Sequence, residues 1–413
     1  MAKNRKTPDN YELANRWNKQ NALTAWGLGG YKRFNRGIWE AVDDDVIRQE
    51  TMKVIVDARS QKVRPTKALL TSVLELARVD ISVNPKLWDA NQDVVVCNNG
   101  TLHIPTRRLL PHDPLLYATS RLEFDYDPAA QAPNFISVMK RLPPEKAEFV
   151  QEFAGYCLTT DVRHEISVWF YGPIGSGKST ILLGLQAMLS SRCGILGVTD
   201  IQRSRFGLSN LPGKTLVIST EQPDGIMATD IINKIISGEP ITIDRKFVTP
   251  YEITPYAKVA WALNKFPMIT DTNNGIMRRV KIVEFPVLPD AKQNPDVKER
   301  VKTEGAGILN WALDGLDRLR NRGNFNIPDC VKDDTKEFIK NSDIPALFLE
   351  DVNAEIGPQY KSGGEQLFEA FDKWCRKTNH KSMSSTKLAV EWVRLGFVRK
   401  RDNGHSYWHG VGL

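Results

Sequence analysis

The segment YGPIGSGKST at residues 171–180 places glycines, a lysine and a hydroxyl at the spacing G-x-x-x-x-G-K-S. An apolar run expected as a strand precedes it and a run expected as a helix follows, which is the context in which such a loop binds phosphate. The glycines let backbone N–H groups close around a β-phosphate at the helix N-terminus. Lys178 would reach the terminal phosphates, and Ser179 would offer its hydroxyl to Mg²⁺. The sequence thus predicts a site for ATP and Mg²⁺ formed by Gly172, Pro173, Ile174, Gly175, Ser176, Gly177, Lys178, Ser179 and Thr180.

A second apolar run, LVIST, is predicted as a strand and is followed by Glu221. A carboxylate at that strand end could polarise an attacking water and bind the metal together with Ser179. Because Thr220 occupies the preceding position, a single acid stands here. Glu221 would then act alone as the base, with metal contacts mostly through water. The alternative is an ordinary solvated glutamate at a strand end.

Further along the chain, ITIDRKF and TPYEITP are predicted to pair as a hairpin with Arg245, Lys246 and Phe247 at its tip. Two cations and an aromatic ring at an exposed turn suit a phosphate chain and the face of a base or sugar. By themselves, these residues fit an ordinary basic hairpin equally well.

Polar residues also flank two more predicted strands. Asn264 follows YAKVAWAL, where a side-chain amide could sense a γ-phosphate. Arg278 and Arg279 precede VKIVEF, and arginines so placed can act as fingers that enter the site of a neighbouring subunit. Surface arginines without such a role are the alternative.

Taken in order, these motifs resemble those of the superfamily III helicases of viruses, phages and plasmids, most of all the poxvirus-type and phage-type primase-helicases. The resemblance covers roughly residues 25–413 and includes VVVCNNGTLHIPTRRLL, FDYDPAAQAPNF and EGAGILNWALDGLDRL. It implies an α/β fold with an AAA+-like P-loop ATPase core and a ring, expected as a hexamer. It also implies that the hairpin of Lys246 grips single-stranded DNA in the channel of the ring. Asn264 would be the sensor, and Arg279, with Arg278 beside it, would be the finger acting in trans.

The sequence departs from this family at two places. Thr220 stands where many members carry an acid, which leaves the detail of metal coordination open. Too little chain precedes residue 80 for a primase polymerase domain, so priming activity is not expected.

Secondary-structure patterns predict four regions. A small mixed region comes first, followed by a region of short strands and a helical end, which the resemblance implies is a collar or oligomerisation domain. The third region alternates strands and helices, which indicates a mainly parallel sheet and the ATPase domain. The last region reads as two helices and a hairpin, a pattern typical of a winged helix. The predicted bounds are 1–79, 80–163, 164–330 and 341–413.

The charge of the chain favours a polyanionic partner. The net charge is +7 and the sequence pI is near 9.0. Between Lys373 and Arg401 there are nine basic residues and one acid. Arg399, Lys400 and Arg401 in the predicted wing would contact DNA phosphate, although they could merely keep a small domain soluble. Trp374, Trp392 and Trp408 are predicted to be core residues rather than base-stacking ones.

Composition excludes several other classes of protein. No apolar run approaches the ~18 residues that a membrane helix needs. The basic N-terminus is not followed by the apolar segment of a secretory signal, so the cytoplasm of a bacterial host is the expected location. Five dispersed cysteines and six histidines without ligand spacing predict neither a disulfide framework nor a transition-metal site.

The leading prediction is an ATP-dependent replicative DNA helicase of a phage, plasmid or related mobile element. Its expected partners are single-stranded and forked DNA, further copies of itself and a separate primase or polymerase. An origin-binding initiator, in which ATP only switches assembly, is the second reading. A nucleotide kinase or metabolic ATPase is a third, which the basic hairpin and wing disfavour.

Overall fold

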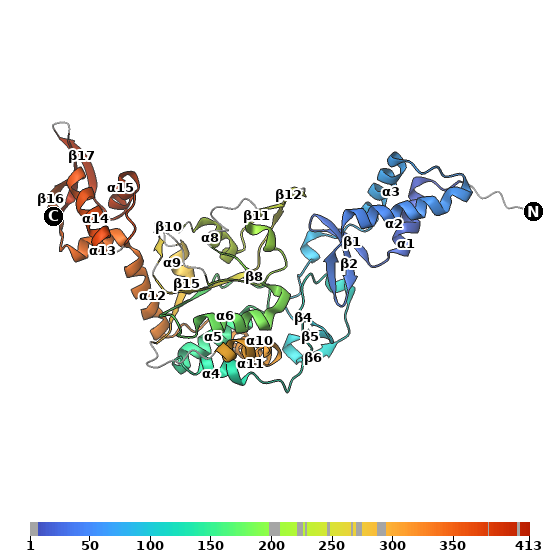
Figure 1. Cartoon of the computed structure of the whole chain (residues 1–413), viewed down its shortest axis with the longest axis horizontal. Helices are drawn as coiled ribbons and strands as arrows, with labels where there is room; N and C mark the ends of the chain where they lie inside the picture. Colours follow the sequence, from blue (N-terminus) through green and yellow to red (C-terminus); the bar gives the residue numbers. More distant parts are fainter. Residues whose placement is uncertain are drawn as a thin grey trace, which may run out of the picture.

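The computed structural model describes residues 7–197, 207–220, 226–227, 229–245, 248–265, 267–269, 275–286, 295–378, 380–402 and 405–413. Figure 1 shows a central sheet with its helices, an N-terminal group of helices and small sheets at one end, and a C-terminal group at the other. The two termini lie at opposite ends of this arrangement.

Three helices and a small meander make up the N-terminal group. Asp9 forms a capping box at the start of the first helix, and Asp43 caps the second, which explains the acidic run there. The antiparallel sheet has the order β1-β2-β3. The elements are α1 (Asn10–Gln20), β1 (Thr24–Gly27), β2 (Gly30–Asn35), β3 (Ile38–Ala41), α2 (Asp44–Asp57), η1 (Ala58–Gln61) and α3 (Lys67–Asp80).

A second small antiparallel sheet, β4-β5-β6, connects this group to the centre. The segment DVVVCNNGTLHI forms its first two strands. Its elements and the neighbouring 3-10 turns are η2 (Pro85–Leu87), β4 (Val94–Cys97), β5 (Gly100–His103), η3 (Ile104–Thr106), β6 (Arg108–Leu110) and η4 (Pro114–Leu116).

The central sheet has five parallel strands in the order β15-β7-β13-β9-β8, which confirms the predicted parallel sheet. Side chains alternate between its faces, so that Val168 and Phe170 enter one hydrophobic cluster and Trp169 the other. Because both faces are covered, the strands read as continuous apolar runs. The strands are β7 (Ser167–Tyr171), β8 (Cys193–Ile195), β9 (Leu216–Ser219), β13 (Lys258–Leu263) and β15 (Val280–Glu284).

Helices and short elements surround this sheet. The helices are α4 (Pro133–Met139), α5 (Pro144–Tyr156), α6 (Lys178–Leu189), α8 (Asp230–Ser237), α9 (Gly275–Arg279), α10 (Pro295–Lys302) and α11 (Gly305–Arg322). The predicted hairpin is present as an antiparallel pair, β11 (Ile241–Arg245) and β12 (Val248–Ile253). The remaining pieces are η5 (Ser190–Arg192), η6 (Gly207–Asn210), β10 (Ile226–Met227) and β14 (Met268–Ile269).

The helices α5 and α11 cross with their backbones in contact. A Cβ on Gly155 would lie 2.4 Å from the Ala312 carbonyl oxygen, and one on Gly315 would lie 2.3 Å from the Gln151 carbonyl oxygen. Only glycine permits this approach. As a result α4 and α5 share one hydrophobic cluster with β7, α6 and α11, and the domain boundary predicted at residue 163 passes through that cluster.

The C-terminal group has the order helix, strand, two helices and a hairpin, and its antiparallel sheet has the order β16-β18-β17. The predicted helices and hairpin are confirmed, whereas the structure adds α13 and β16. Trp374, Trp392 and Trp408 are buried here, as predicted. The helix α12 (Asp329–Ser342) leads into this group, whose elements are α13 (Ile344–Asp351), β16 (Glu355–Gly363), α14 (Gly364–Lys377), α15 (Ser385–Arg394), β17 (Val398–Asp402) and β18 (His405–Gly412).

The helix α12 closes one edge of the central sheet. Thr335 Oγ1 accepts a hydrogen bond from the Ile282 N–H at 3.0 Å, and Asp334 Oδ2 accepts one from the Glu284 N–H at 2.9 Å. These side chains thus occupy N–H groups that the edge strand β15 would otherwise leave open. The contact also anchors the segment that leads to the C-terminal group.

Candidate active site

The glycine-rich loop joins the end of β7 to the start of α6. Gly172, Gly175 and Gly177 adopt φ values of 143°, 85° and 112°, which residues with a side chain rarely adopt. A Cβ on Gly172 would also lie 2.8 Å from the Phe285 carbonyl oxygen. Gly177 caps α6 without a side-chain hydrogen bond, and the Thr180 N–H donates to the Gly177 carbonyl oxygen at 3.0 Å, so the N–H groups of Lys178 and Ser179 are left for an anion. The loop is therefore shaped to receive a phosphate.

The side chain of Lys178 is folded back onto this loop. Its Nζ donates hydrogen bonds to the carbonyl oxygens of Gly172 at 2.7 Å and Pro173 at 2.6 Å, and to Ser176 Oγ at 3.2 Å. Burial lowers the pKa of Lys178 to about 8, because an ammonium group away from water is disfavoured. A phosphate would offer the stronger partner of opposite charge.

Parallel pairing brings the other predicted residues to the same edge of the sheet. The Gly172 N–H donates to the Leu263 carbonyl oxygen at 3.3 Å, so Asn264 follows directly beside the start of the loop. The strand β9 lies on the other side of β13, with Ser219 in register with Trp261. Thr220 and Asn264 are both exposed at these strand ends. Glu221, the predicted base, lies outside the described residues.

A half-buried hydroxyl is available for a metal at this edge. Ser179 lies in the first turn of α6, next to the loop. Within the described residues, no group of three or more His, Cys, Asp or Glu side chains is placed to hold a metal ion. A bound Mg²⁺ would therefore be held by Ser179, by phosphate oxygens of the nucleotide and by Glu221, whose role stays a prediction.

One arginine beside the loop was missed by the sequence analysis. The exposed Arg141, in the turn between α4 and α5, has its Nη1 3.5 Å from the position that a Cβ on Gly177 would take. Across the described part of the chain, no hydrogen bond or ion pair holds this guanidinium. Its distance in sequence from the glycine-rich segment gives no local signal of this proximity.

The two predicted finger arginines lie at the amino ends of the central strands, whereas the glycine-rich loop lies at their carboxyl ends. In the register of the edge pair, Val280 of β15 aligns with Ser167 of β7, and Glu284 aligns with Tyr171. Arg278 and Arg279 precede Val280, whereas the loop follows Tyr171. They are thus separated from their own loop by four strand steps, roughly 13 Å at about 3.3 Å per residue.

The hairpin that was predicted to bind DNA is described only at its base. Lys246, Phe247 and the side chain of Arg245 lie outside the described residues. Tyr251 of β12 packs against the turn between β1 and β2, where a Cβ on Gly29 would lie 3.3 Å from its ring. The hairpin is therefore in contact with the N-terminal meander.

A polar network joins the N-terminal group to the central sheet. The Asp89 carboxylate accepts hydrogen bonds from the Thr119 N–H at 2.8 Å, from Thr119 Oγ1 at 2.5 Å and from the Tyr256 hydroxyl at 2.7 Å. Tyr256 follows β12, so this network fixes the base of the hairpin. Burial, with the nearby Asp89 charge, raises the pKa of Tyr256.

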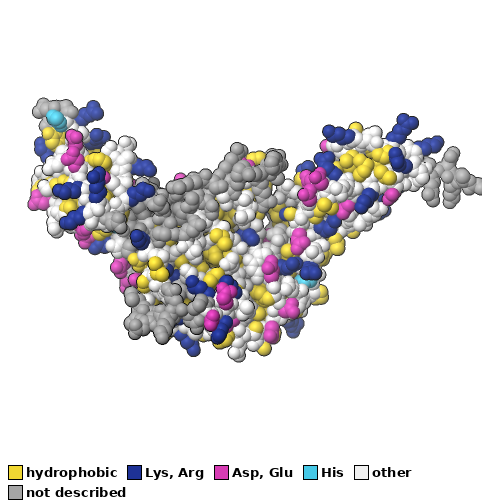
Figure 2. Space-filling view, in the orientation of Figure 1, with side chains coloured by type: hydrophobic (Ala, Val, Ile, Leu, Met, Phe, Trp, Pro, Cys, Tyr) yellow, Lys and Arg dark blue, Asp and Glu magenta, His cyan; other side chains and the backbone are white. Residues whose placement is uncertain are grey.

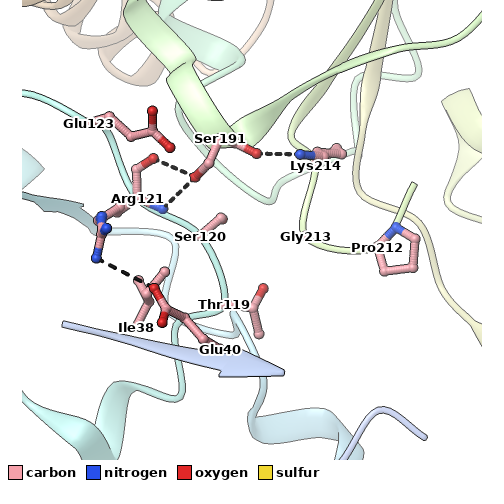
Figure 3. Close-up of a pocket in the computed structure, with 10 residues that line it drawn as sticks. All are labelled: Ile38, Glu40, Thr119, Ser120, Arg121, Glu123, Ser191, Pro212, Gly213 and Lys214. Atoms are coloured by element: carbon pink, nitrogen blue, oxygen red, sulfur yellow. Dashed lines mark hydrogen bonds and ion pairs between the residues drawn. The ribbon is translucent and has the colours of Figure 1, made fainter. Parts of the chain in front are cut away.

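A cavity of about 230 Å³ lies along the same boundary (Figure 3). Ser191 bridges its wall, since its Oγ accepts from the Arg121 N–H at 3.1 Å and donates to the Arg121 carbonyl oxygen at 2.8 Å. Lys214 Nζ donates to the Ser191 carbonyl oxygen at 2.5 Å, and Arg121 lies 3.8 Å from Glu40. The cavity is lined by two cations, Arg121 and Lys214, and by two acidic residues, Glu40 and Glu123, so it carries no excess of either charge.

The predicted wing residues Arg399, Lys400 and Arg401 are exposed on β17. Figure 2 shows Lys and Arg side chains over this C-terminal group. A groove of about 750 Å³ runs between the hairpin and the starts of α14 and α15, and Arg399 lines it. The exposed residues of α15 include Ser385, Thr386 and Lys387 in its first turn, followed by Val390 and Val393, which are 65% and 61% exposed.

Two family models match separate parts of the chain. Residues 13–142 match a family described as "D5 N terminal like", and residues 170–279 match a family of unknown function, DUF5906. No curated protein matches the chain significantly.

Among the described helices, none has the length and apolarity that a membrane crossing requires.

Solved structures extend the likeness to nearly the whole chain. The C-terminal region of NrS-1, in its A-form apo structure, is similar over 98% of this chain and 100% of that chain, with a TM-score of 0.54 at 9% identity. A second A-form structure of that region gives a TM-score of 0.52 at 10% identity. JCV helicase bound to a small molecule is aligned over 46% of this chain and 60% of that chain, with a TM-score of 0.34 at 14% identity. The NrS-1 likeness shows a shared fold.

Proposed function

We propose that the protein is an ATP-dependent DNA helicase of the superfamily III type, acting in the replication of a phage, plasmid or related element. The observation that carries this proposal is the single sheet edge that gathers the glycine-rich loop, the end of β9 and Asn264. The strand order β15-β7-β13-β9-β8, with the loop after β7, supports an AAA+-like core. The match of residues 13–142 to the D5-type family supports a replication helicase.

The nucleotide site would work as follows. The N–H groups at the start of α6 hold the β-phosphate, and Lys178 leaves the loop carbonyls for the terminal phosphates. Arg141 adds a second cation from the side of the turn between α4 and α5. When bound, ATP with Mg²⁺ supplies the hydrolysable bond, with Ser179 as a ligand of the metal. Glu221 removes the proton from the attacking water, and Asn264 positions that water against the γ-phosphate.

The site would be completed by a second copy of the chain. Arg278 and Arg279 lie roughly 13 Å of strand away from the loop of their own subunit, by four steps of about 3.3 Å. They can act on nucleotide only in an adjacent subunit, which supports a ring, proposed here as a hexamer. We place the protein in the cytoplasm of a bacterial host, where a separate primase or polymerase would act with it.

DNA would be held at two places. Arg245, Lys246 and Phe247 at the hairpin tip bind a single strand in the channel through phosphate contacts and stacking. Contact of Tyr251 and Tyr256 with the N-terminal group supports a hairpin whose movement is transmitted to that group. Arg399, Lys400 and Arg401 bind phosphate from a winged-helix domain, which the order helix, strand, two helices and hairpin supports.

For the domains, we propose 1–79 as the small N-terminal region and 341–413 as the winged helix. The predicted bounds of the collar and the ATPase were 80–163 and 164–330. Because α4 and α5 share one hydrophobic cluster with α6 and α11, we propose instead that the ATPase begins at α4 and that the collar ends before it.

The second candidate function is an origin-binding initiator. The exposed side of α15 bears on it, because a helix that reads base edges in the major groove needs polar side chains there. On α15 the exposed Ser385, Thr386 and Lys387 are followed by the apolar Val390 and Val393, whereas the wing carries three adjacent cations and Arg399 lines the groove beside it. The wing is therefore the better DNA contact, which favours contact with phosphate over reading of sequence.

The first experiment is strand separation on forked DNA carrying a 3′ or a 5′ tail, with Lys178→Ala and Lys246→Ala as variants. A helicase separates one fork in the presence of ATP, and each substitution abolishes separation. Lys246→Ala retains nucleotide binding, because it lies outside the loop. Sequence-selective duplex binding without separation on either fork, with ATPase intact, would replace this proposal by the initiator.

A further inference from the structure

Two adjacent arginines have opposite environments. The side chain of Arg279 is 10% exposed, whereas that of Arg278 is 67% exposed. Arg279 Nε and Nη2 both contact Glu165 Oε2, at 2.8 Å and 2.7 Å. Arg278 Nη2 lies 3.6 Å from the same oxygen. The Glu165 carboxylate therefore holds the Arg279 guanidinium closely and the Arg278 guanidinium loosely.

Arg279 also binds two further elements. Its Nη1 donates to the Gly275 carbonyl oxygen at 3.1 Å and to Asn233 Oδ1 at 3.4 Å. These partners belong to α9 and α8, and Glu165 precedes β7. A side chain with partners on three elements fixes the position of the helix that carries it. Withdrawing Arg279 would leave a partly buried carboxylate without its closest cation, which is costly.

Glu165 is itself held in an unusual backbone conformation. Its φ is +43°, in the left-handed region that residues with a side chain seldom occupy, and its N–H donates to the Val162 carbonyl oxygen at 2.9 Å. Such a conformation persists where the surroundings fix it, and it often marks a functional position. Here it directs the carboxylate toward the end of α9.

We propose that Arg278 is the guanidinium that enters the site of the neighbouring subunit, and that Arg279 is a positioning residue locked by Glu165 and Asn233. This inference rests on the proposed ring. Arg278 can leave Glu165 at little cost, because an exposed ion pair contributes little to stability. The division of roles reverses the sequence-based expectation, in which Arg279 was the finger and Arg278 its neighbour.

The test compares steady-state ATP hydrolysis by assembled Arg278→Ala, Arg279→Lys and Glu165→Gln, together with affinity for ADP and the thermal midpoint. Arg163→Ala is the matched control, since Arg163 is an exposed arginine (side chain 69% exposed) two residues before Glu165. We expect Arg278→Ala to lower kcat by about 1000-fold or more, in line with other arginine fingers, with ADP affinity and thermal midpoint unchanged.

The positioning residues should give a different signature. For Glu165→Gln we expect kcat to fall severalfold with KM for ATP unchanged, a split that a purely structural role would not give. The thermal midpoint should fall, because the nearly buried Arg279 loses its closest anion. Arg279→Lys should lower kcat less than Arg278→Ala and should lower the thermal midpoint. Arg163→Ala should retain full hydrolysis. Hydrolysis by Arg278→Ala close to wild type, with loss in Arg279→Lys, would overturn the proposal, as would equal loss in Arg163→Ala.

Mixed assemblies separate this inference from the proposed function. Subunits with Lys178→Ala keep their arginines, and subunits with Arg278→Ala keep their loop, so a mixture forms some complete sites and regains hydrolysis. Absence of recovery in the mixture would refute action in trans by Arg278. Wild-type hydrolysis that does not depend on subunit concentration, with no oligomer present, would instead refute the ring.

Discussion

Nucleotide affinity should fall as the pH rises, because the cation of the loop is poised to lose its proton. Burial lowers the pKa of Lys178 to about 8 in the free protein. A bound phosphate favours the ammonium form and raises that pKa, so binding takes up a proton at pH values between the two. The affinity is therefore greatest below pH 8 and declines above it.

The size of the effect follows from the fraction of charged Lys178. With a pKa of about 8, the ammonium form makes up about 90% of the free protein at pH 7 and about 10% at pH 9. If the ammonium form alone binds the polyphosphate, the dissociation constant rises about tenfold over this range, or about 1.4 kcal/mol.

The assay is equilibrium titration with a fluorescent ADP and Mg²⁺ at pH 7, 8 and 9 and constant ionic strength, since ADP is not consumed. Lys178→Arg is the matched control, because a guanidinium keeps its charge over the whole range and its binding should not vary with pH. Lys178→Met should bind weakly at every pH. A wild-type dissociation constant that changes less than twofold between pH 7 and pH 9 would refute the reasoning.

Three predictions concern stability, each measured by urea unfolding. Gly315→Ala should lose about 1–3 kcal/mol, because the new methyl group would lie 2.3 Å from the Gln151 carbonyl oxygen, whereas Gly30→Ala, with open space around it, should lose less. Glu304→Ala should lose about 2–4 kcal/mol, since the buried carboxylate accepts from the Asn134 and Phe135 N–H groups at 3.0 Å and 2.8 Å; a loss below about 0.5 kcal/mol would contradict this. Burial lowers the pKa of Lys258 to about 7, so the unfolded chain binds the additional proton above that pH, and stability should rise between pH 7 and 9. Lys258→Met should remove about 1.4 kcal/mol per pH unit of that slope, and an unchanged slope would contradict the assignment.

Local patterns predicted the elements that carry their own signal. The glycine spacing at residues 172–179 and the continuous apolar run of β7 predict a phosphate loop between a buried strand and a helix, and both are present. The strand β16 was missed because five of its nine residues are exposed and no apolar alternation marks it. The crossing of α5 and α11 was missed because the need for glycine appears only when the two backbones meet.

In the candidate site, too, residues with a local signal were predictable from the sequence, and contacts between distant segments were not. A motif read along the chain gives the residues that follow strands, because the carboxyl ends of parallel strands converge. It cannot give Arg141 or Glu165, whose closeness to Gly177 and Arg279 depends on how distant segments fold together. It also could not rank Arg278 against Arg279, since burial, rather than order in the sequence, separates them.

The topology of the sheet accounts for the separation of the glycine-rich loop from Arg278 and Arg279. Residues after the parallel strands meet at one edge, and residues before them meet at the other, so one subunit presents the loop and the arginines on opposite sides. In the proposed ring, each interface joins the loop edge of one subunit to the arginine edge of the next. The arginine edge must then be rigid enough to place a guanidinium yet leave one guanidinium free to move. The closely held Arg279 and the exposed Arg278 meet these two requirements, which neither residue could meet alone.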